Sequence, residues 1–145
     1  RRVRGLCEKC KVAYAAAPYG LQQLGLGPGR LAWKGRRQVS QRYTVHGFEY
    51  QYVGQVMPAQ PTFYKAGGCE VCNKKGFIGR RGIYELMVID DTIGPLILKN
   101  ADALTVKRAA VLQGMDTLRD DGARKVLAGL TTVEEVLAAT QEDVA

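Results

Sequence analysis

All four cysteines of this 145-residue chain occur in two C-x-x-C pairs, and this pattern constrains the fold more than any other feature of the sequence. Cys7 and Cys10 stand in LCEKC, and Cys69 and Cys72 stand in GGCEVCNKKG. A two-residue spacer lets one backbone turn bring two sulfurs to a metal ion, and two such turns complete a tetrahedron of thiolates. The sequence therefore predicts that two distant segments meet at one metal centre.

Zinc is the expected ion of this centre, with Cys7, Cys10, Cys69 and Cys72 as its ligands. No charged and then apolar leader opens the sequence, and reducing thiol pools keep cysteines free in non-secreted proteins. Two disulfides, a redox-active pair and an iron centre remain as alternatives, although a thioredoxin-type pair needs a βαβ context that neither pair has. Four thiolates leave no position for water, so the expected role is structural.

The residues around the cysteines also suit a metal centre. Gly76 can adopt the positive φ angle of a sharp turn at low cost. Lysines flank both pairs, and their charge favours thiolates and offsets the negative charge of a four-thiolate zinc centre: Lys9, Lys11, Lys74 and Lys75.

The length of the chain and its 46% hydrophobic content allow one modest core or two small ones. No apolar stretch reaches the roughly 18 to 20 residues that a membrane-spanning helix needs. The chain begins at an arginine without a methionine. From this we expect a piece of a longer, non-secreted protein.

Charge divides the chain into a basic front and an acidic back. Residues 1–87 carry 15 lysines and arginines against four acidic residues, and residues 88–145 carry six against ten. A basic front can meet nucleic acid, anionic lipid or an acidic protein surface, or it can simply be solvated.

The 58 residues between the cysteine pairs should carry structure of their own. The glycine-rich stretch 20–37 indicates loops or short turns. Residues 42–45 and 48–53 alternate like strands around His46 and Gly47, which predicts a β-hairpin with His46 as a solvated turn residue. Three tyrosines near Arg36, Arg37 and Arg42 could stack single-stranded nucleic acid, but a buried hairpin face is the commoner reason for such a pattern: Tyr43, Tyr50 and Tyr52.

After the second pair, residues 82–89 form a strand pattern and the period then changes to that of helices. Asp90 or Asp91 can cap a first helix in which Pro95 lies near the first turn. Asp102 can cap a second helix that ends before Gly114, with Leu104, Ala109, Val111 and Leu112 as its apolar positions. Thr117 starts a third helix that stops at Gly129, and Thr132 with Glu135 forms a capping box for a fourth. Four short helices with short joints predict a small bundle.

Three runs together resemble the C-terminal part of the ATPases that drive type II secretion and type IV pilus assembly: RVRGLCEKC, GCEVCNKKGFIGRRGIYELMVIDD and QGMDTLRDDGARKVLAGLTTVEEVLAAT. The resemblance covers residues 1–10 and about 62–145. The family's Gly-Arg-x-Gly-x-x-Glu turn is met by Gly79, Arg80, Gly82 and Glu85. Its tail pattern is similar to Gly114-Met115-x-Thr117-Leu118, then Asp121-Gly122, then Gly129-x-Thr131-Thr132.

The resemblance implies that the four cysteines bind zinc and that the chain belongs to a hexameric motor. No G-x-x-x-x-G-K-[ST] sequence occurs in these residues, so ATP and Mg²⁺ are expected only in a motor core upstream, and this chain alone should not hydrolyse ATP. The implied partner is an inner-membrane platform protein, with anionic lipid as a further contact. The implied location is cytoplasmic, at the periphery of the inner membrane.

The expected fold class is α+β. A tetracysteine zinc subdomain should span residues 1–89, with a hairpin-containing insert at about 11–61, and a helical subdomain should span residues 90–145. A zinc-ribbon module that binds nucleic acid is the main alternative, and a chaperone-type zinc module is another. The capped helical tail argues against both, since neither needs it.

Overall fold

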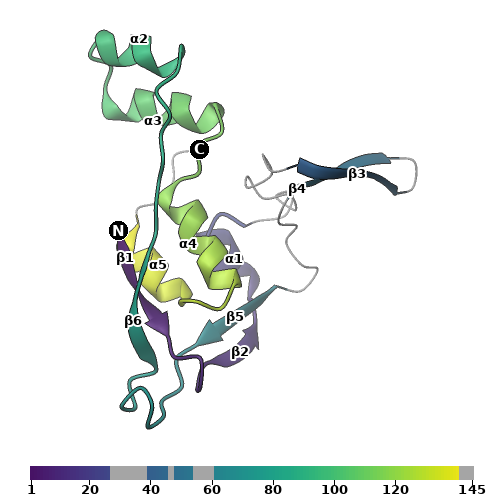
Figure 1. Cartoon of the computed structure of the whole chain (residues 1–145), viewed down its shortest axis with the longest axis vertical. Coiled ribbons are helices and arrows are strands. Elements are labelled where there is room, and N and C mark those ends of the chain that lie inside the picture. The colour runs from purple at the N-terminus through teal and green to yellow at the C-terminus, as the bar shows by residue number, and fades with distance from the viewer. Residues whose placement is uncertain (27–38, 46–47, 54–60, 141–145) are drawn as a thin grey trace.

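In the computed structural model the described residues are 1–26, 39–45, 48–53 and 61–140; for 39–45 and 48–53 only the backbone pairing is described. The chain combines short helices with small antiparallel sheets, which confirms the α+β class (Figure 1). The strands are β1 (Arg2–Leu6), β2 (Val12–Ala15), β3 (Val39–Val45), β4 (Phe48–Val53), β5 (Thr62–Lys65) and β6 (Phe77–Gly82). The helices are α1 (Pro18–Gln23), α2 (Ile93–Leu98), α3 (Ala103–Leu112), α4 (Leu118–Leu127) and α5 (Val133–Ala139).

The strands pair as three two-stranded ribbons, β1 with β6, β2 with β5, and β3 with β4. The pairs are nested along the chain, so each of the first two joins segments from opposite sides of the insert. In β1 and β6 Val3 lies opposite Arg81, and in β2 and β5 Tyr14 lies opposite Phe63. Both cysteine pairs lie in the connections between these two ribbons.

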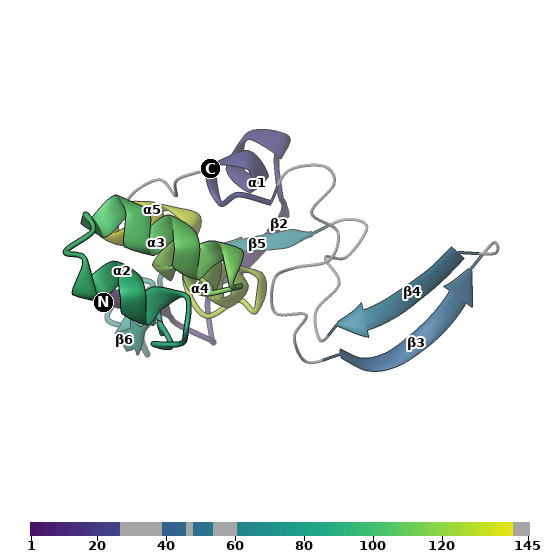
Figure 2. The ribbon, with the colours of Figure 1, turned by 90° about the horizontal axis from the view of Figure 1, so that it is seen from above.

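The predicted hairpin is confirmed as β3 and β4, which pair Arg42 with Gln51 and Tyr43 with Tyr50. Figures 1 and 2 draw it to one side of the other elements. The stretch 20–37, expected to form loops or short turns, includes the end of α1. Residues 27–38, the turn at His46 and the proposed tyrosine face lie outside the described residues and side chains.

The strand predicted over residues 82–89 is wrong in its bounds. The strand is β6, which ends at Gly82, and residues 83–90 contain no strand. Arg1, the first residue of the sequence, exchanges hydrogen bonds with Ile83, and no described residue pairs with the backbone of residues 85–89. Beyond Gly82 the chain runs straight to α2 (Figure 1).

The predicted helix starts are largely confirmed, because short polar side chains satisfy the free backbone amides there. Asp102 accepts a hydrogen bond from the Thr105 amide at 2.8 Å, and Thr117 and Asp120 form a reciprocal capping box on α4. Ahead of α2 the Asp90 carboxylate accepts from the amides of Thr92 and Ile93, each at 2.9 Å.

Two details of the helix predictions are wrong. In α3 the buried residue is Ala110, whereas Leu104 and Leu112 are exposed, because only one side of this helix contacts Ile93 and Met115. At α5, Thr132 accepts from the Glu135 amide, but the Glu135 carboxylate does not bond back to Thr132; it binds Arg4 instead.

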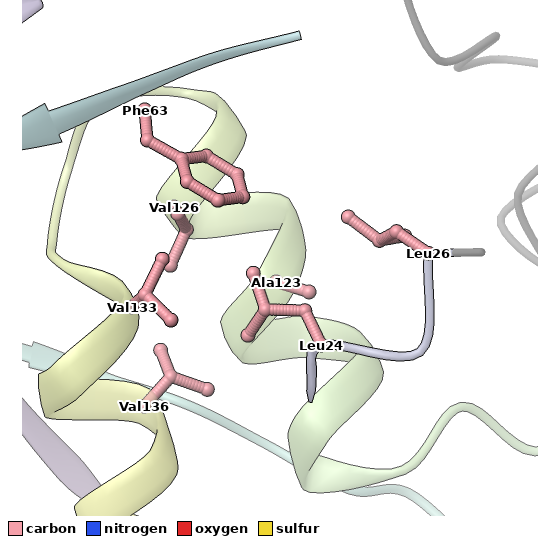
Figure 3. Packing of buried hydrophobic residues seen from close by; sticks show 7 residues of the cluster. All are labelled: Leu24, Leu26, Phe63, Ala123, Val126, Val133 and Val136. Atoms are coloured by element: carbon pink, nitrogen blue, oxygen red, sulfur yellow. The ribbon is translucent and has the colours of Figure 1, made fainter. Parts of the chain in front are cut away.

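The helices divide between two hydrophobic clusters. The larger one joins α4 and α5 to α1 and β5 (Figure 3): Leu24, Leu26, Phe63, Ala123, Val126, Val133 and Val136. The smaller one lies between α2 and α3 and contains Ile93, Ala110 and Met115. The larger cluster contains residues from both sides of the boundary predicted between residues 89 and 90. The division of the chain into subdomains 1–89 and 90–145 stays a prediction.

Candidate metal centre

The first cysteine pair lies in a tight turn between β1 and β2. The carbonyl oxygen of Cys7 accepts hydrogen bonds from the amides of Cys10 at 3.4 Å and Lys11 at 3.0 Å. These bonds fold the Cys-Glu-Lys-Cys segment so that both side chains point to the same side. The turn is therefore a knuckle that presents two sulfurs together.

The second pair lies in a similar turn between β5 and β6. The carbonyl oxygen of Cys69 accepts from the Lys74 amide at 2.8 Å, and that of Cys72 accepts from the Lys75 amide at 3.2 Å. Gly76 has a φ of 80°, which confirms the expected turn glycine, and Asn73 and Lys74 are also left-handed, with φ of 53° and 64°. The left-handed conformations of Asn73 and Lys74 were not predicted from the sequence. Asparagine after the second cysteine was the available signal, since it tolerates this conformation better than most residues.

The two knuckles are held against each other through the backbone. The amide of Cys7 donates to the carbonyl oxygen of Gly76 at 2.9 Å. Gly67 passes so close to the first knuckle that a Cβ atom there would lie 2.1 Å from the carbonyl oxygen of Cys10. A side chain at this position is excluded, because real Cβ atoms do not approach a backbone oxygen so closely.

The four sulfurs converge on one point. The Sγ atoms of Cys7 and Cys69 lie 3.8 Å apart, and Cys72 Sγ lies 3.7 Å from those of Cys10 and Cys69. All four sulfurs lie within 4.8 Å of one another. A tetrahedral ion with bonds of about 2.3 Å separates its sulfurs by roughly 3.8 Å. The cluster therefore fits one four-coordinate metal ion.

Disulfides are absent from this arrangement, because a disulfide needs sulfurs about 2.05 Å apart and all four cysteines are free thiols. Cys7 and Cys72 are buried, and Cys10 and Cys69 are half-buried. All four ligand positions are thus filled from the protein, with no open position for a substrate or a water molecule. The centre is suited to hold structure and not to perform catalysis.

Backbone amides stabilise negative charge on the sulfurs. Gly76 donates to Cys72 Sγ at 3.1 Å, Cys69 donates to the same sulfur at 3.3 Å, and Gly68 donates to Cys10 Sγ at 3.2 Å. Burial alone raises the pKa of Cys72, but the two amides and the neighbouring thiols outweigh it and lower the pKa to about 6. Burial and the neighbouring thiols raise the pKa of Cys10 to about 12. Without a cation the Cys10 thiol therefore keeps its proton at neutral pH, whereas a bound metal ion deprotonates its thiol ligands.

Two of the four flanking lysines have other partners. The Lys11 ammonium group lies 2.9 Å from a Glu8 carboxylate oxygen and donates to the carbonyl oxygen of Gly129 at 3.0 Å. Lys74 pairs with Glu70 at 2.8 Å. Each knuckle therefore has a lysine whose charge is paired with a glutamate. The groups that donate hydrogen bonds to the sulfurs are backbone amides.

The metal centre is joined to the C-terminal helices through β1. The Leu6 amide donates to the carbonyl oxygen of Leu130 at 2.9 Å, and the Thr131 hydroxyl donates to that of Arg4 at 2.8 Å. The Arg4 guanidinium lies 2.7 Å from Glu135 and over the ring of Phe77. Burial alone raises the pKa of Glu135, but the bonds from Arg4 outweigh it and hold the pKa below its ordinary value.

The Gly-Arg-x-Gly-x-x-Glu motif, expected to be a turn, lies mostly in a strand: Gly79, Arg80 and Gly82 belong to β6, and Glu85 follows it and contacts the start of α4. A Glu85 carboxylate oxygen accepts from the Leu118 amide at 3.0 Å, at the start of α4. The Tyr84 amide donates to Asp121 at 2.9 Å, and Lys125 lies over the Tyr84 ring. Arg80 is exposed on β6. Glu85 and Asp121 thus hold the end of the ribbon of β1 and β6 on α4.

The comparison with protein families agrees with this assembly of motifs. The sequence model described as "Type II/IV secretion system protein" matches residues 1–138. This chain belongs to the type II/IV secretion system protein family. The match includes the insert at about 11–61, which was expected to lie outside the resemblance, so that limit was wrong.

Relatives within the type II/IV secretion family carry two kinds of name. The chain is 38% identical over 142 residues to the type IV pilus assembly ATPase PilB of Thermus thermophilus, covering 98% of this chain and 13% of that protein. It is 37% identical over 143 residues to the type II secretion system protein E of Pseudomonas aeruginosa, covering 99% of this chain and 22% of that protein. The chain thus spans less than a quarter of the length of these relatives. Within its described helices, none is long and apolar enough to cross a membrane.

Proposed function

We propose that this chain is the zinc-binding and helical portion of an ATPase that powers type IV pilus assembly or type II protein secretion. The family match and the names of the relatives support this function. The 145 residues contain no P-loop sequence, so we place the binding of ATP and Mg²⁺ in the part of the protein that corresponds to the unmatched length of the relatives.

The convergence of the four sulfurs of Cys7, Cys10, Cys69 and Cys72 is the observation that carries the proposed zinc role. Zinc is the expected ion because structural zinc sites are closed, four-coordinate and often formed from cysteine alone. Iron also binds four cysteines, so metal analysis of protein purified without added metal is the test. One zinc per chain supports the assignment, and one iron or no metal contradicts it.

The mechanical role that we propose is the transfer of motor movement to an inner-membrane platform protein. The metal centre fixes β1 and β6, β1 is bonded to Leu130, Thr131 and Glu135, and the end of β6 is bonded to α4. Such a cross-linked body can move as a unit within a hexamer. The ATPase would act in the cytoplasm at the periphery of the inner membrane.

The basic front of the chain is the proposed contact surface. A defined mechanical coupling needs a defined docking geometry, so we expect an acidic surface of the platform protein first and anionic lipid second. Both contacts should weaken as salt increases. Co-sedimentation with anionic liposomes, with and without the cytoplasmic domain of the platform protein, separates them. Binding that survives both deletion of residues 20–60 and reversal of Arg36 and Arg37 to glutamate would place the contact elsewhere.

The full-length protein with Cys69→Ser and Cys72→Ser tests the coupling role itself. We expect loss of zinc, of platform binding and of pilus assembly or secretion, with ATP turnover retained at least in part. Val71→Ser is the matched control, because Val71 lies inside a knuckle and is exposed but offers neither a sulfur nor a charge. A zinc-free variant that still binds the platform domain and supports assembly would refute the proposed role.

A further inference from the structure

Most of the large apolar side chains that are exposed on the described residues lie between Tyr84 and Leu112. They are densest in the segment 84–89, which joins β6 to α2 (Figure 1). Tyr84 is 71% exposed, Leu86 79%, Val88 69% and Ile89 57%. A contiguous exposed apolar stretch of this kind is rare on the surface of a soluble protein and marks a site of contact with another part of a protein.

The segment is apolar on both of its sides. Side chains alternate along an extended chain, so Tyr84, Leu86 and Val88 share one side and Met87 and Ile89 share the other. Only Glu85 breaks the apolar character, and it is held by the start of α4. A strand with apolar residues on both sides is typical of a sheet that is covered by helices on both faces.

The backbone of the segment is also unpaired. Ile83 exchanges two hydrogen bonds with Arg1, at 2.8 and 2.9 Å, and the Tyr84 amide donates to Asp121. Within the described ranges the amides of residues 85–89 donate no hydrogen bond. The segment therefore has the sequence of a buried strand, and among the described residues its backbone has no pairing partner on either edge.

We propose that residues 84–89 are an interior strand of a β-sheet that lies in the part of the full-length protein outside these 145 residues. This occupant rests on the proposed function, since ATPases with a P-loop contain a largely parallel sheet with helices on both faces. The relatives support it by their length, since the chain matches only 13% and 22% of two of them. A second copy of this chain is a poorer occupant, because its described sheets are two-stranded ribbons that can pair an edge but cannot cover two faces.

Fixed points at both ends make the segment suitable for this role. Ile83 is fully buried at its start, and the Asp90 carboxylate bonds the first turn of α2 at its end. Six residues at about 3.3 Å each span roughly 20 Å, the length of an ordinary strand. The metal centre is then continuous with the motor sheet through β6, and α4 is attached to the same strand by Glu85 and Asp121.

Hydrogen exchange in the full-length protein tests this proposal, with a synthetic peptide of residues 83–90 as the unstructured reference. We expect exchange at all consecutive amides from 85 to 89 to be slowed by about 100-fold or more, because an interior strand bonds to a neighbour on each side. Exchange as fast as in the peptide would overturn the proposal. Protection of alternate amides that depends on protein concentration would indicate pairing between copies and would overturn it as well.

A matched pair of substitutions tests the side chains in the full-length protein. Leu86 and Leu112 are similarly exposed here, at 79% and 86%, so neither Leu86→Asp nor Leu112→Asp should disturb the described residues. We expect Leu86→Asp to lower the melting temperature or prevent folding and Leu112→Asp to have little effect. Equal effects would overturn the proposal. If Leu86→Asp does not fold, the exchange experiment on the unsubstituted protein still decides.

Measuring ATP turnover in the same preparation separates this proposal from the proposed function. An active ATPase in which residues 85–89 exchange freely refutes the strand and leaves the function intact. A protein without ATPase activity in which these amides are protected refutes the function and leaves the strand in some other sheet.

Discussion

Replacement of Gly122 by alanine tests how tightly α4 packs on α5. A Cβ atom at Gly122 would lie 2.5 Å from Val136 Cγ1 and 3.0 Å from Cγ2. Val136 is fully buried in the larger cluster and branched at Cβ, so it has little freedom to turn away (Figure 3). Gly122→Ala should therefore displace the two helices.

The expected free-energy change is the difference between two effects. Overpacking in a core costs about 1–3 kcal/mol, and alanine in place of glycine within a helix gains about 0.5–1 kcal/mol. Gly122→Ala should therefore destabilise the protein by roughly 0–2 kcal/mol. In α2, a Cβ atom at Gly94 would meet no heavy atom within 4 Å. Gly94→Ala is the matched control: its methyl group meets open space, but Pro95 follows and disfavours the helical conformation for a residue with a Cβ atom, so little or no gain in stability is expected.

Thermal unfolding of the zinc-saturated protein measures the contrast. At about 4 °C per kcal/mol for a chain of this size, Gly122→Ala should melt up to roughly 8 °C below Gly94→Ala. Val136→Ala removes the two methyl groups in question, so it should make room for the methyl group that Gly122→Ala adds. The double variant should be more stable than the sum of the two single changes predicts. A Gly122→Ala variant that melts as high as Gly94→Ala, with no coupling to Val136→Ala, would refute the packing argument.

Three further predictions concern the metal centre, a helix cap and the chemistry of the chain. Gly67→Ala should weaken zinc binding, because the added Cβ meets the Cys10 carbonyl oxygen at the first knuckle. A competitive chelator titration measures the zinc affinity, and an unchanged affinity would contradict the prediction. Hydrogen bonds from the Thr105 amide and hydroxyl lower the pKa of Asp102, so its charge stabilises the fold above its ordinary pKa and this contribution is lost as pH falls through the lowered value. Asp102→Asn should thus be less stable than the unsubstituted protein at pH 7, with a gap that closes below about pH 4; a gap independent of pH in urea unfolding would show the reasoning wrong. Residues 1–145 alone should show no ATP hydrolysis, and turnover that persists through repeated purification would disprove that expectation.

The individual cysteine knuckles and the local helix signals could be predicted from sequence because they depend on residues close together in the chain. A C-x-x-C pair defines a knuckle by itself, and Asp102 and Thr117 reach amides only three residues away. The β3 and β4 hairpin is local in the same way. These features required no knowledge of the rest of the fold.

Other features depend on which distant surfaces meet, and these could be seen only in the folded chain. Glu135 has the spacing of a capping box, but Arg4 competes for its carboxylate and a charged partner binds it more strongly than a backbone amide does. The apolar residues of α3 gave no sign of which ones face Ile93 and Met115. The residue pattern of segment 84–89 favours a strand, and the cysteine pair of segment 7–10 favours a metal ion. In the folded chain Cys69 and Cys72 meet Cys7 and Cys10, so the four sulfurs could hold an ion together. Segment 84–89 finds no partner in the described residues, because a strand needs a neighbour that its own sequence cannot specify.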